Sequence, residues 1–156
     1  MIAFYYVDKK YADYLRTHDR KVPNTDYETH RKFVCGVVLH VNGVKYYAPI
    51  SHDTQKRQTS ILIRDKGRPI SSIKFCFMIP VVDSAIAKMD FKAIEQIDSQ
   101  YASLLRTEYR FCLKNIDRIE EKALSVYKIG NNKNHALNKY CCDFLKLEAA
   151  SKQYQL

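Results

Sequence analysis

The first half of the chain contains short runs rich in β-branched and aromatic residues, a composition typical of β-strands. The runs that predict strands cover residues 2–7, 32–41, 44–50, 59–64 and 71–81. Between the second and third runs stands Asn42-Gly43, the strongest short signal for a β-hairpin. Residues 65–70 contain a glycine and a proline and predict a turn. This half therefore predicts mainly antiparallel sheet.

Two other parts of the pattern repeat at the helical spacing of three and four residues. Residues 9–19 predict a helix that Asp8 can cap. From Phe91 to Tyr127 the same spacing predicts one long helix or two broken ones, with Glu108 interrupting the apolar positions. Residues 137–148 predict a last amphipathic helix. Strands first and helices later predict an α+β fold, in which a compact, strongly bent antiparallel sheet or barrel carries helices and the C-terminal half is helical.

Length and composition favour a single domain over residues 1–156, because a chain of 156 residues can bury a sizeable core. Hydrophobic residues make up 46% of the chain, which excludes a disordered polar protein. No apolar run approaches the ~18 residues that a membrane-spanning helix needs. The N-terminus lacks the basic start and long apolar middle of a signal peptide, so we expect a cytoplasmic protein.

The cysteines favour buried free thiols rather than a metal site. Five are present, an odd number, and they are irregularly spaced and mostly flanked by apolar residues. Zinc sites use paired Cys, or Cys and His, at short spacing, and the adjacent Cys141 and Cys142 form a poor chelate. We therefore expect no metal and no cofactor.

The net charge of +9 is unevenly distributed along the chain. Residues 1–74 carry a net charge of +7, whereas residues 75–156 carry only +2. The chain also contains twelve tyrosines. Basic charge combined with aromatic rings favours a polyanion that offers bases for stacking, which is single-stranded nucleic acid. A solvated basic surface without such a ligand is the alternative that composition leaves open.

The polar segment after the third predicted strand is the main candidate for chemistry. Pro49 is expected to end that strand, because proline has no N–H to donate. Residues 51–57 are all polar and contain no glycine, unlike a simple turn. Within them are two hydroxyls, an imidazole and two cations: Ser51, Thr54, His52, Lys56 and Arg57.

These groups suit RNA cleavage without a metal ion, in which the 2′-OH attacks the adjacent phosphorus and the 5′-oxygen leaves. The reaction needs a proton acceptor, a proton donor, and cations or donors around the phosphoryl oxygens. His52 can exchange protons near neutral pH, and Lys56 or Arg57 can balance the developing charge. Ser51, His52 and Asp53 cannot form a triad with one another, because adjacent side chains on an extended segment point apart. Ordinary polar loop residues are the alternative reading.

Three longer stretches occur in a fixed order along the first half of the chain. They are D-x-K-V-P-N from Asp19 to Asn24, Y-x-A-P-I-S from Tyr46 to Ser51, and K-F-x-F-M-I-P from Lys74 to Pro80. No single stretch is diagnostic, but the combination is fairly specific. Together they resemble the ToxN/AbiQ family of type III toxin–antitoxin endoribonucleases, and within it the CptN-like toxins. The helical remainder of the chain is similar in character.

The resemblance implies a fold similar to the MazF/Kid toxins, with a bent antiparallel sheet and added helices. It implies a metal-independent endoribonuclease that cuts cellular or phage RNA and leaves a 2′,3′-cyclic phosphate and a 5′-OH. It also implies an RNA inhibitor made of pseudoknot repeats, which the toxin cuts from a longer transcript. Toxin and RNA would alternate in a closed assembly.

The resemblance also assigns individual residues. The family's hydroxyl after the Ala-Pro pair corresponds to Ser51, and its active-site lysine corresponds best to Lys56. The tyrosine at the start of the first helix corresponds to Tyr11. A loop tyrosine corresponds to Tyr27, and the basic residue entering the second strand corresponds to Lys32.

The loop departs from the family pattern at one point. The expected order after the Ala-Pro pair is Thr-Ser-Pro-Lys, whereas residues 51–56 read Ser-His-Asp-Thr-Gln-Lys. The proline is missing, and His52 replaces the second hydroxyl. This exchange makes His52 a candidate for the general base or acid and leaves the position of the lysine open by one or two residues.

The sequence therefore predicts an endoribonuclease toxin with a cleavage loop that contains Ser51, His52, Thr54 and Lys56. The residues expected to contact RNA are Tyr11, Tyr27, Lys32, Lys21 and Arg57. The alternative is a non-catalytic single-stranded RNA-binding module, which would use the same charge and tyrosines but would need neither His52 nor Lys56. Cleavage of single-stranded RNA in excess EDTA separates the two.

Overall fold

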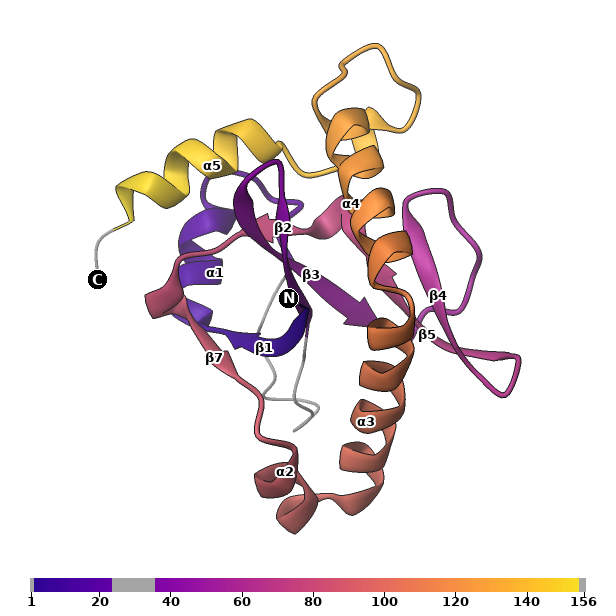
Figure 1. Cartoon of the computed structure of the whole chain (residues 1–156). Coiled ribbons are helices and arrows are strands. Elements are labelled where there is room, and N and C mark those ends of the chain that lie inside the picture. The colour runs from indigo at the N-terminus through magenta and orange to yellow at the C-terminus, as the bar shows by residue number, and fades with distance from the viewer. Residues whose placement is uncertain (1, 24–35, 155–156) are drawn as a thin grey trace.

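The strands form one antiparallel sheet in a computed structural model that describes residues 2–23 and 36–154. Within these residues the strand order is β4-β5-β3-β2-β1-β7, and β6 pairs with β3 beside this path (Figure 1). The bounds of the strands are β1 Ala3–Val7, β2 Gly36–Val41, β3 Val44–Ser51, β4 Ser60–Asp65, β5 Arg68–Lys74, β6 Ile79–Pro80 and β7 Ile86–Lys88. The antiparallel sheet expected from the strand pattern is confirmed.

The sheet is bent but open in the described part of the chain, so the barrel expected from the sequence is not observed. Its edges are β4 and β7, and no ladder joins them. The two edge strands explain why the sheet does not close into a barrel. β7 is only three residues long, and β4 packs against the helices that follow the sheet in the sequence. Covering an edge with helices protects its backbone in place of closure.

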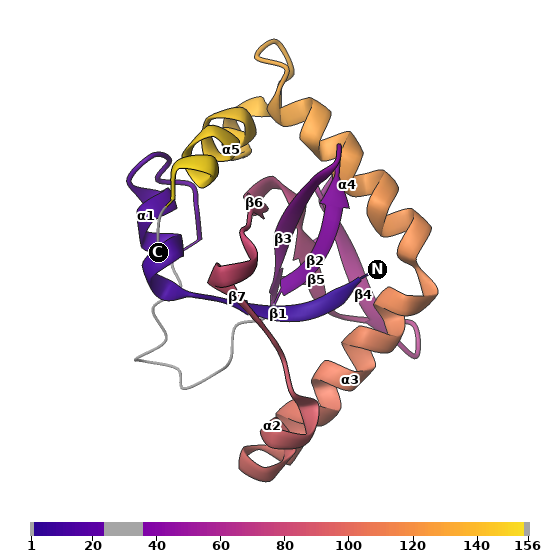
Figure 2. The ribbon, with the colours of Figure 1, turned by 60° about the vertical axis from the view of Figure 1, so that its left-hand side comes forward.

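The helices form an arc around the sheet, and all of them except α1 follow the strands in sequence (Figure 2). The α+β class with a helical C-terminal half is thereby confirmed. Their bounds are α1 Lys9–Arg16, α2 Phe91–Ile97, α3 Ser99–Lys114, α4 Ile116–Gly130 and α5 Phe144–Gln153. Short 3₁₀ helices lie at η1 Phe75–Phe77, η2 Asp83–Ala85 and η3 Asn138–Tyr140. No helix in the described residues is long and apolar enough to cross a membrane.

Several expected boundaries differ from the observed ones. The periodic stretch from Phe91 contains three helices, because Asp98 ends α2 and its carboxylate caps α3 by accepting from the N–H of Tyr101 at 3.0 Å. The expected strand 71–81 is divided by η1. The expected helix 137–148 is replaced by η3 and α5.

Strand β3 continues through Pro49, where we expected it to end. Up to Pro49 the strand pairs with β2, and from Ile50 it pairs with β5. Pro49 thus lies where the strand changes partners, a place at which the missing N–H of proline is tolerated. Its partner is Gly36, where a Cβ would lie only 2.4 Å from the ring of Tyr47. The bend in the sheet is therefore built into one strand, and that strand delivers Ser51.

The core lies between the sheet and the helices, and its one buried carboxylate among the described residues, Glu108, is hydrogen-bonded. Glu108 is 3% exposed and accepts a hydrogen bond from Ser71 Oγ at 2.5 Å, which links α3 to β5. Glu108, which interrupts the apolar helix pattern in the sequence, is therefore part of the interior. Burial raises the pKa of the Glu108 carboxyl. The expected free thiols are confirmed for the four described cysteines, which are all buried.

Candidate active site at the end of strand β3

The polar loop, residues 52–59, is fixed at several points along its length. At its start, Ser51 Oγ accepts a hydrogen bond from the N–H of Asp53 at 3.1 Å. Ser72 Oγ on β5 donates to the carbonyl of Asp53 at 2.7 Å. Farther along, Lys122 Nζ on α4 donates to the carbonyl of Gln58 at 3.1 Å. The loop is thus held against the sheet and one helix, as a catalytic segment requires.

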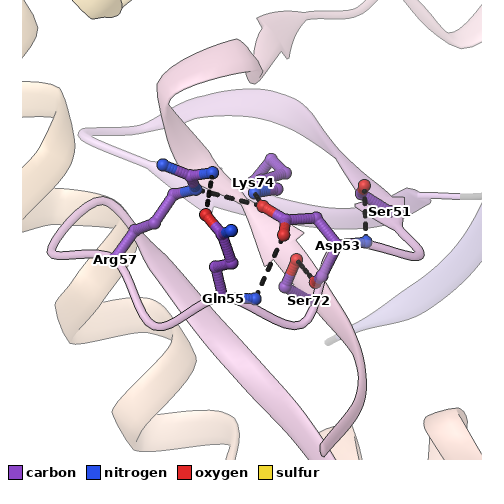
Figure 3. A network of polar contacts seen from close by, with 6 residues as sticks. All are labelled: Ser51, Asp53, Gln55, Arg57, Ser72 and Lys74. Atoms are coloured by element: carbon purple, nitrogen blue, oxygen red, sulfur yellow. Dashed lines mark hydrogen bonds and ion pairs between the residues drawn. The ribbon is translucent and has the colours of Figure 1, made fainter.

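Asp53 is the centre of a polar network (Figure 3). Its carboxylate accepts from the N–H of Gln55 and from Arg57 Nε, each at 3.0 Å, and forms an ion pair with Lys74 Nζ. The hydrogen bond from Lys74 holds the pKa of Asp53 well below its usual range, with further contributions from the N–H of Gln55 and from Arg57. The Lys74 side chain is only 10% exposed, whereas that of Arg57 is 50% exposed. One carboxylate therefore orients two cations at different depths.

A cavity of about 630 Å³ adjoins this network. Ser51, Asp53, Arg57 and Lys74 contribute to its lining, so a hydroxyl, a carboxylate and two cations face the same space. The remaining lining includes apolar and aromatic side chains from η1 and from the segment around η3. The combination of a few convergent polar groups with apolar walls is typical of a ligand site.

The structure brings together only some of the loop residues selected from the sequence. Ser51 is half-buried and lines the cavity, and Arg57 lines it as well. His52, Thr54 and Lys56 lie on the same loop, but they are exposed and do not line the cavity. Their assignment as catalytic residues stays a prediction.

The residues expected to contact RNA elsewhere are more scattered. Tyr11 is fully buried and donates from its hydroxyl to the carbonyl of Pro80 at 2.6 Å, a placement that gives it no surface for a nucleotide. Burial raises the pKa of the Tyr11 hydroxyl. Lys21 is exposed and donates from Nζ to the carbonyl of Cys141 at 3.0 Å, beside a separate small cavity. Tyr27 and Lys32 lie outside the described residues.

Two charged residues of the network were not selected from the sequence. Asp53 was considered only as a member of a triad, and Lys74 only as the first letter of a motif. A signal for Lys74 was present, because Ser72 and Lys74 share one face of a strand whose other face carries Ile73. A lysine in such an alternating strand predicts a partner of opposite charge. The sequence does not show that this partner is Asp53, which lies on the loop after the neighbouring strand β3.

The site provides a hydroxyl, a carboxylate and two cations that the carboxylate orients. Among the described residues, His, Cys, Asp and Glu do not gather in groups of three that could hold a metal ion. Cations with little exposure to solvent interact more strongly with an anion than surface cations do. The arrangement can therefore bind a phosphate group near Ser51 and stabilise negative charge that develops on it.

Comparison with known proteins shows to which family the chain belongs. The model of the family described as "Toxin ToxN, type III toxin-antitoxin system" matches residues 3–152. The chain is 32% identical to Endoribonuclease ToxN of Bacillus thuringiensis subsp. kurstaki, over 97% of this chain and 84% of that protein. It is 26% identical to Endoribonuclease AbiQ of Lactococcus lactis subsp. lactis, over 98% of this chain and 89% of that protein.

Solved structures show the same fold. One, from work on selective toxin inhibition by a non-coding RNA pseudoknot in type III systems, superposes with a TM-score of 0.87 at 30% identity and covers 98% of this chain and 97% of its own. A second, of the lactococcal anti-phage endoribonuclease AbiQ, has a TM-score of 0.78 at 24% identity, over 99% of this chain and 98% of its own. The chain therefore belongs to the ToxN family of type III toxin–antitoxin toxins.

Proposed function

We propose that the chain is an endoribonuclease toxin that cleaves single-stranded RNA without a metal cofactor. The observation that carries the proposal is the juxtaposition of Ser51 with Lys74 and Arg57 around one cavity, in a chain from a family with relatives named as endoribonucleases. A hydroxyl and oriented cations around one cavity suit phosphoryl transfer better than simple RNA binding.

The reaction consists of one displacement at phosphorus. The 2′-oxygen of a ribose forms a bond to the adjacent phosphorus, and the bond to the 5′-oxygen of the next nucleotide breaks. A base takes the proton of the 2′-OH, and an acid gives a proton to the departing 5′-oxygen. The products are a 2′,3′-cyclic phosphate and a 5′-OH. No water or metal ion enters this step.

The loop and its surroundings divide these roles. Lys74 and Arg57 hold the phosphoryl oxygens and balance their developing charge. Ser51 donates a hydrogen bond at the same place. His52, which follows Ser51 directly, and Thr54, farther along the loop, are the candidates for proton exchange. Lys56 is a further, exposed cation of the loop.

The partner we propose is an RNA antitoxin of pseudoknot repeats, which the toxin cuts from a longer transcript and which then inhibits it in a closed assembly. Support comes from the related solved structures, which concern toxin inhibition by an RNA pseudoknot and a processed non-coding RNA that regulates an antiviral system. The net charge of +9 suits such a partner. Tyr27, Lys32 and Lys21 are proposed to contact RNA. Tyr11 is not, because it is buried.

Incubation of the purified protein with end-labelled single-stranded RNA in excess EDTA tests the proposal. The expected result is cleavage with products that carry a 2′,3′-cyclic phosphate, and Ser51→Ala is expected to lose most of it. Expression of the wild type alone should stop growth, and expression of Ser51→Ala should not. Tight RNA binding without cleavage would instead identify a non-catalytic RNA-binding module.

A further inference from the structure

The cavity beside Ser51 has a wall that the proposed phosphoryl chemistry does not use. Phe77 from η1, Leu137 just before η3 and Tyr140 at the end of η3 line it together with the polar residues. Ser51 and Tyr140 lie far apart in the sequence, on opposite sides of the helical segment α2–α4. The fold therefore brings Leu137 and the aromatic ring of Tyr140 from the C-terminal half to the polar loop of the N-terminal half.

Tyr140 differs from the tyrosines of the core. Its side chain is 54% exposed, whereas Tyr11 and Tyr46 are fully buried and hydrogen-bonded. Lys139 Nζ lies 5.2 Å from the centroid of the Tyr140 ring, a cation–π arrangement. An exposed ring at a cavity contributes little to the core, but it offers a flat face on which an aromatic ligand can stack.

The segments that carry these rings are fixed to each other by backbone hydrogen bonds. The N–H of Cys142 donates to the carbonyl of Cys76 at 2.9 Å, which ties the end of the η3 segment to η1. The side-chain amide of Asn138 donates to the carbonyls of Ile129 and Gly130 at 3.0 and 2.9 Å, which anchors η3 on the end of α4. Tyr140 is therefore held beside the cavity by a defined local structure.

We infer that Tyr140, supported by Phe77 and Leu137, binds the base of a nucleotide next to the cleaved phosphate. This inference rests on the proposed function, and it names the part of the substrate that the apolar wall recognises. Cations on the polar wall complement a phosphate, and an aromatic ring on the other lining segment complements a base. The cavity volume of about 630 Å³ lies within the usual range of about 300–1,000 Å³ for small-ligand sites. One nucleotide of single-stranded RNA offers both groups: a phosphate for the polar wall and a base for the apolar wall.

A cycle of two changes tests the subsite, one in the protein and one in the RNA. The protein change is Tyr140→Ala, and the RNA change replaces each nucleotide around the mapped cut, in turn, by an abasic residue. We expect Tyr140→Ala to lower kcat/KM on intact RNA by about tenfold or more, the usual loss when a stacked base loses its ring. On RNA that lacks the recognised base, Tyr140→Ala should cause no further loss, because the two changes remove the same contact. Tyr140→Phe keeps the ring and should retain activity.

Leu145→Ala is the matched control. Leu145 is 57% exposed, lies close to Tyr140 in the sequence and does not line this cavity, so its removal should leave both RNAs unaffected. The inference would be overturned if, at every abasic position, the fold-loss in kcat/KM from Tyr140→Ala multiplies with the fold-loss from the abasic change. An equal loss from Leu145→Ala would overturn it too.

Binding gives a second readout that does not depend on cleavage. Short single-stranded RNAs with one abasic residue at each position in turn are titrated against Ser51→Ala protein with and without Tyr140→Ala, and the affinities at the recognised position should show the same absence of additivity. If wild-type protein cleaves no RNA but this binding pattern holds, the proposed endoribonuclease activity fails and the base subsite stands. If wild-type protein cleaves RNA but the two changes act additively in both assays, the proposed endoribonuclease activity stands and the base subsite fails.

Discussion

The ammonium group of Lys74 and the carboxylate of Asp53 form an ion pair that joins strand β5 to the loop after strand β3. Arg57 binds the same carboxylate from the loop itself. A lysine that is nearly buried would lose much of its hydration without such a partner. Asp53 therefore holds the ammonium group of Lys74 at the cavity that Ser51 lines.

The first prediction concerns the acid dependence of stability. The pKa of Asp53 is lowered in the folded protein, so its ionised form stabilises the fold above the ordinary aspartate pKa of about 3.9. That contribution decreases as the pH falls below this value toward the lower folded pKa. Asp53→Asn should thus lower the thermal unfolding midpoint at pH 7, and the difference from wild type should shrink below about pH 4.

Asp83→Asn is the matched control for this measurement. Asp83 also pairs with a lysine, Lys45, and its pKa is lowered by that hydrogen bond. Its side chain is 85% exposed, so water screens the pair and its loss should change the midpoint less. Equal effects of the two substitutions across the pH range would contradict a special role for the Asp53–Lys74 pair.

The second prediction ranks the two lysines near the site. Lys74→Met should lower kcat by ~10²–10³, the usual cost of removing one fixed group that stabilises transition-state charge. Lys56→Ala should cost less, because Lys56 is exposed and does not line the cavity. Single-turnover cleavage rates measure both, with circular dichroism as the check on folding. A larger loss from Lys56→Ala would show that the loop closes over bound RNA and that Lys56 reaches the phosphate.

The third prediction concerns His52 as a proton carrier. A reaction step in which the imidazole of His52 gives or takes a proton should produce an inflection in the pH profile of kcat/KM. His52→Gln should remove the inflection while RNA affinity stays nearly unchanged. The measurement is a pH–rate profile of both proteins on one RNA. An unchanged profile would assign the proton transfer to another group, with Ser51 beside Lys74 as the next candidate.

The fourth prediction follows from the uneven charge, +7 on residues 1–74 and +2 on residues 75–156. Charge reversal at the exposed Lys10 and Arg20 should weaken RNA binding and reduce the slope of log K against log salt by about 1.4, the value for two lost contacts to single-stranded phosphates. The same reversal at the exposed Lys146 and Lys152 is the control and should change the slope little. The titrations use Ser51→Ala protein, which does not consume the RNA. Equal slopes for the two double variants would mean that RNA contacts both halves alike.

Local signals in the sequence predicted the parts of the fold that depend on neighbouring residues. Asn42 and Gly43 adopt positive φ values of 51° and 78°, as the hairpin signal requires. The turn expected over residues 65–70 is narrower, because Lys66 and Gly67 alone take this conformation and β5 begins at Arg68. Turn-forming residue types in the sequence predict such turns well, but they do not show where a paired strand begins.

The parts that depend on distant contacts were not predictable from local pattern. Pro49 predicts a strand end when it is considered alone, yet the second half of β3 finds a new partner in β5. Tyr11 is buried because its helix packs on the rest of the fold, and its hydroxyl donates to the carbonyl of Pro80, 69 residues away. Asp53 and Lys74 lie 21 residues apart and meet only because β3 and β5 are neighbours. The candidate site is therefore a product of topology as much as of the loop sequence.

The change of partner along β3 has a genetic consequence. Because one strand belongs to both parts of the sheet, a substitution that shifts either part also shifts the backbone of Ser51. Cells that survive expression of the toxin without its antitoxin should therefore carry substitutions along this strand as well as in the polar loop. Gly36, which has no room for a side chain beside Tyr47, is the position where the mildest substitution, to alanine, should suffice for survival.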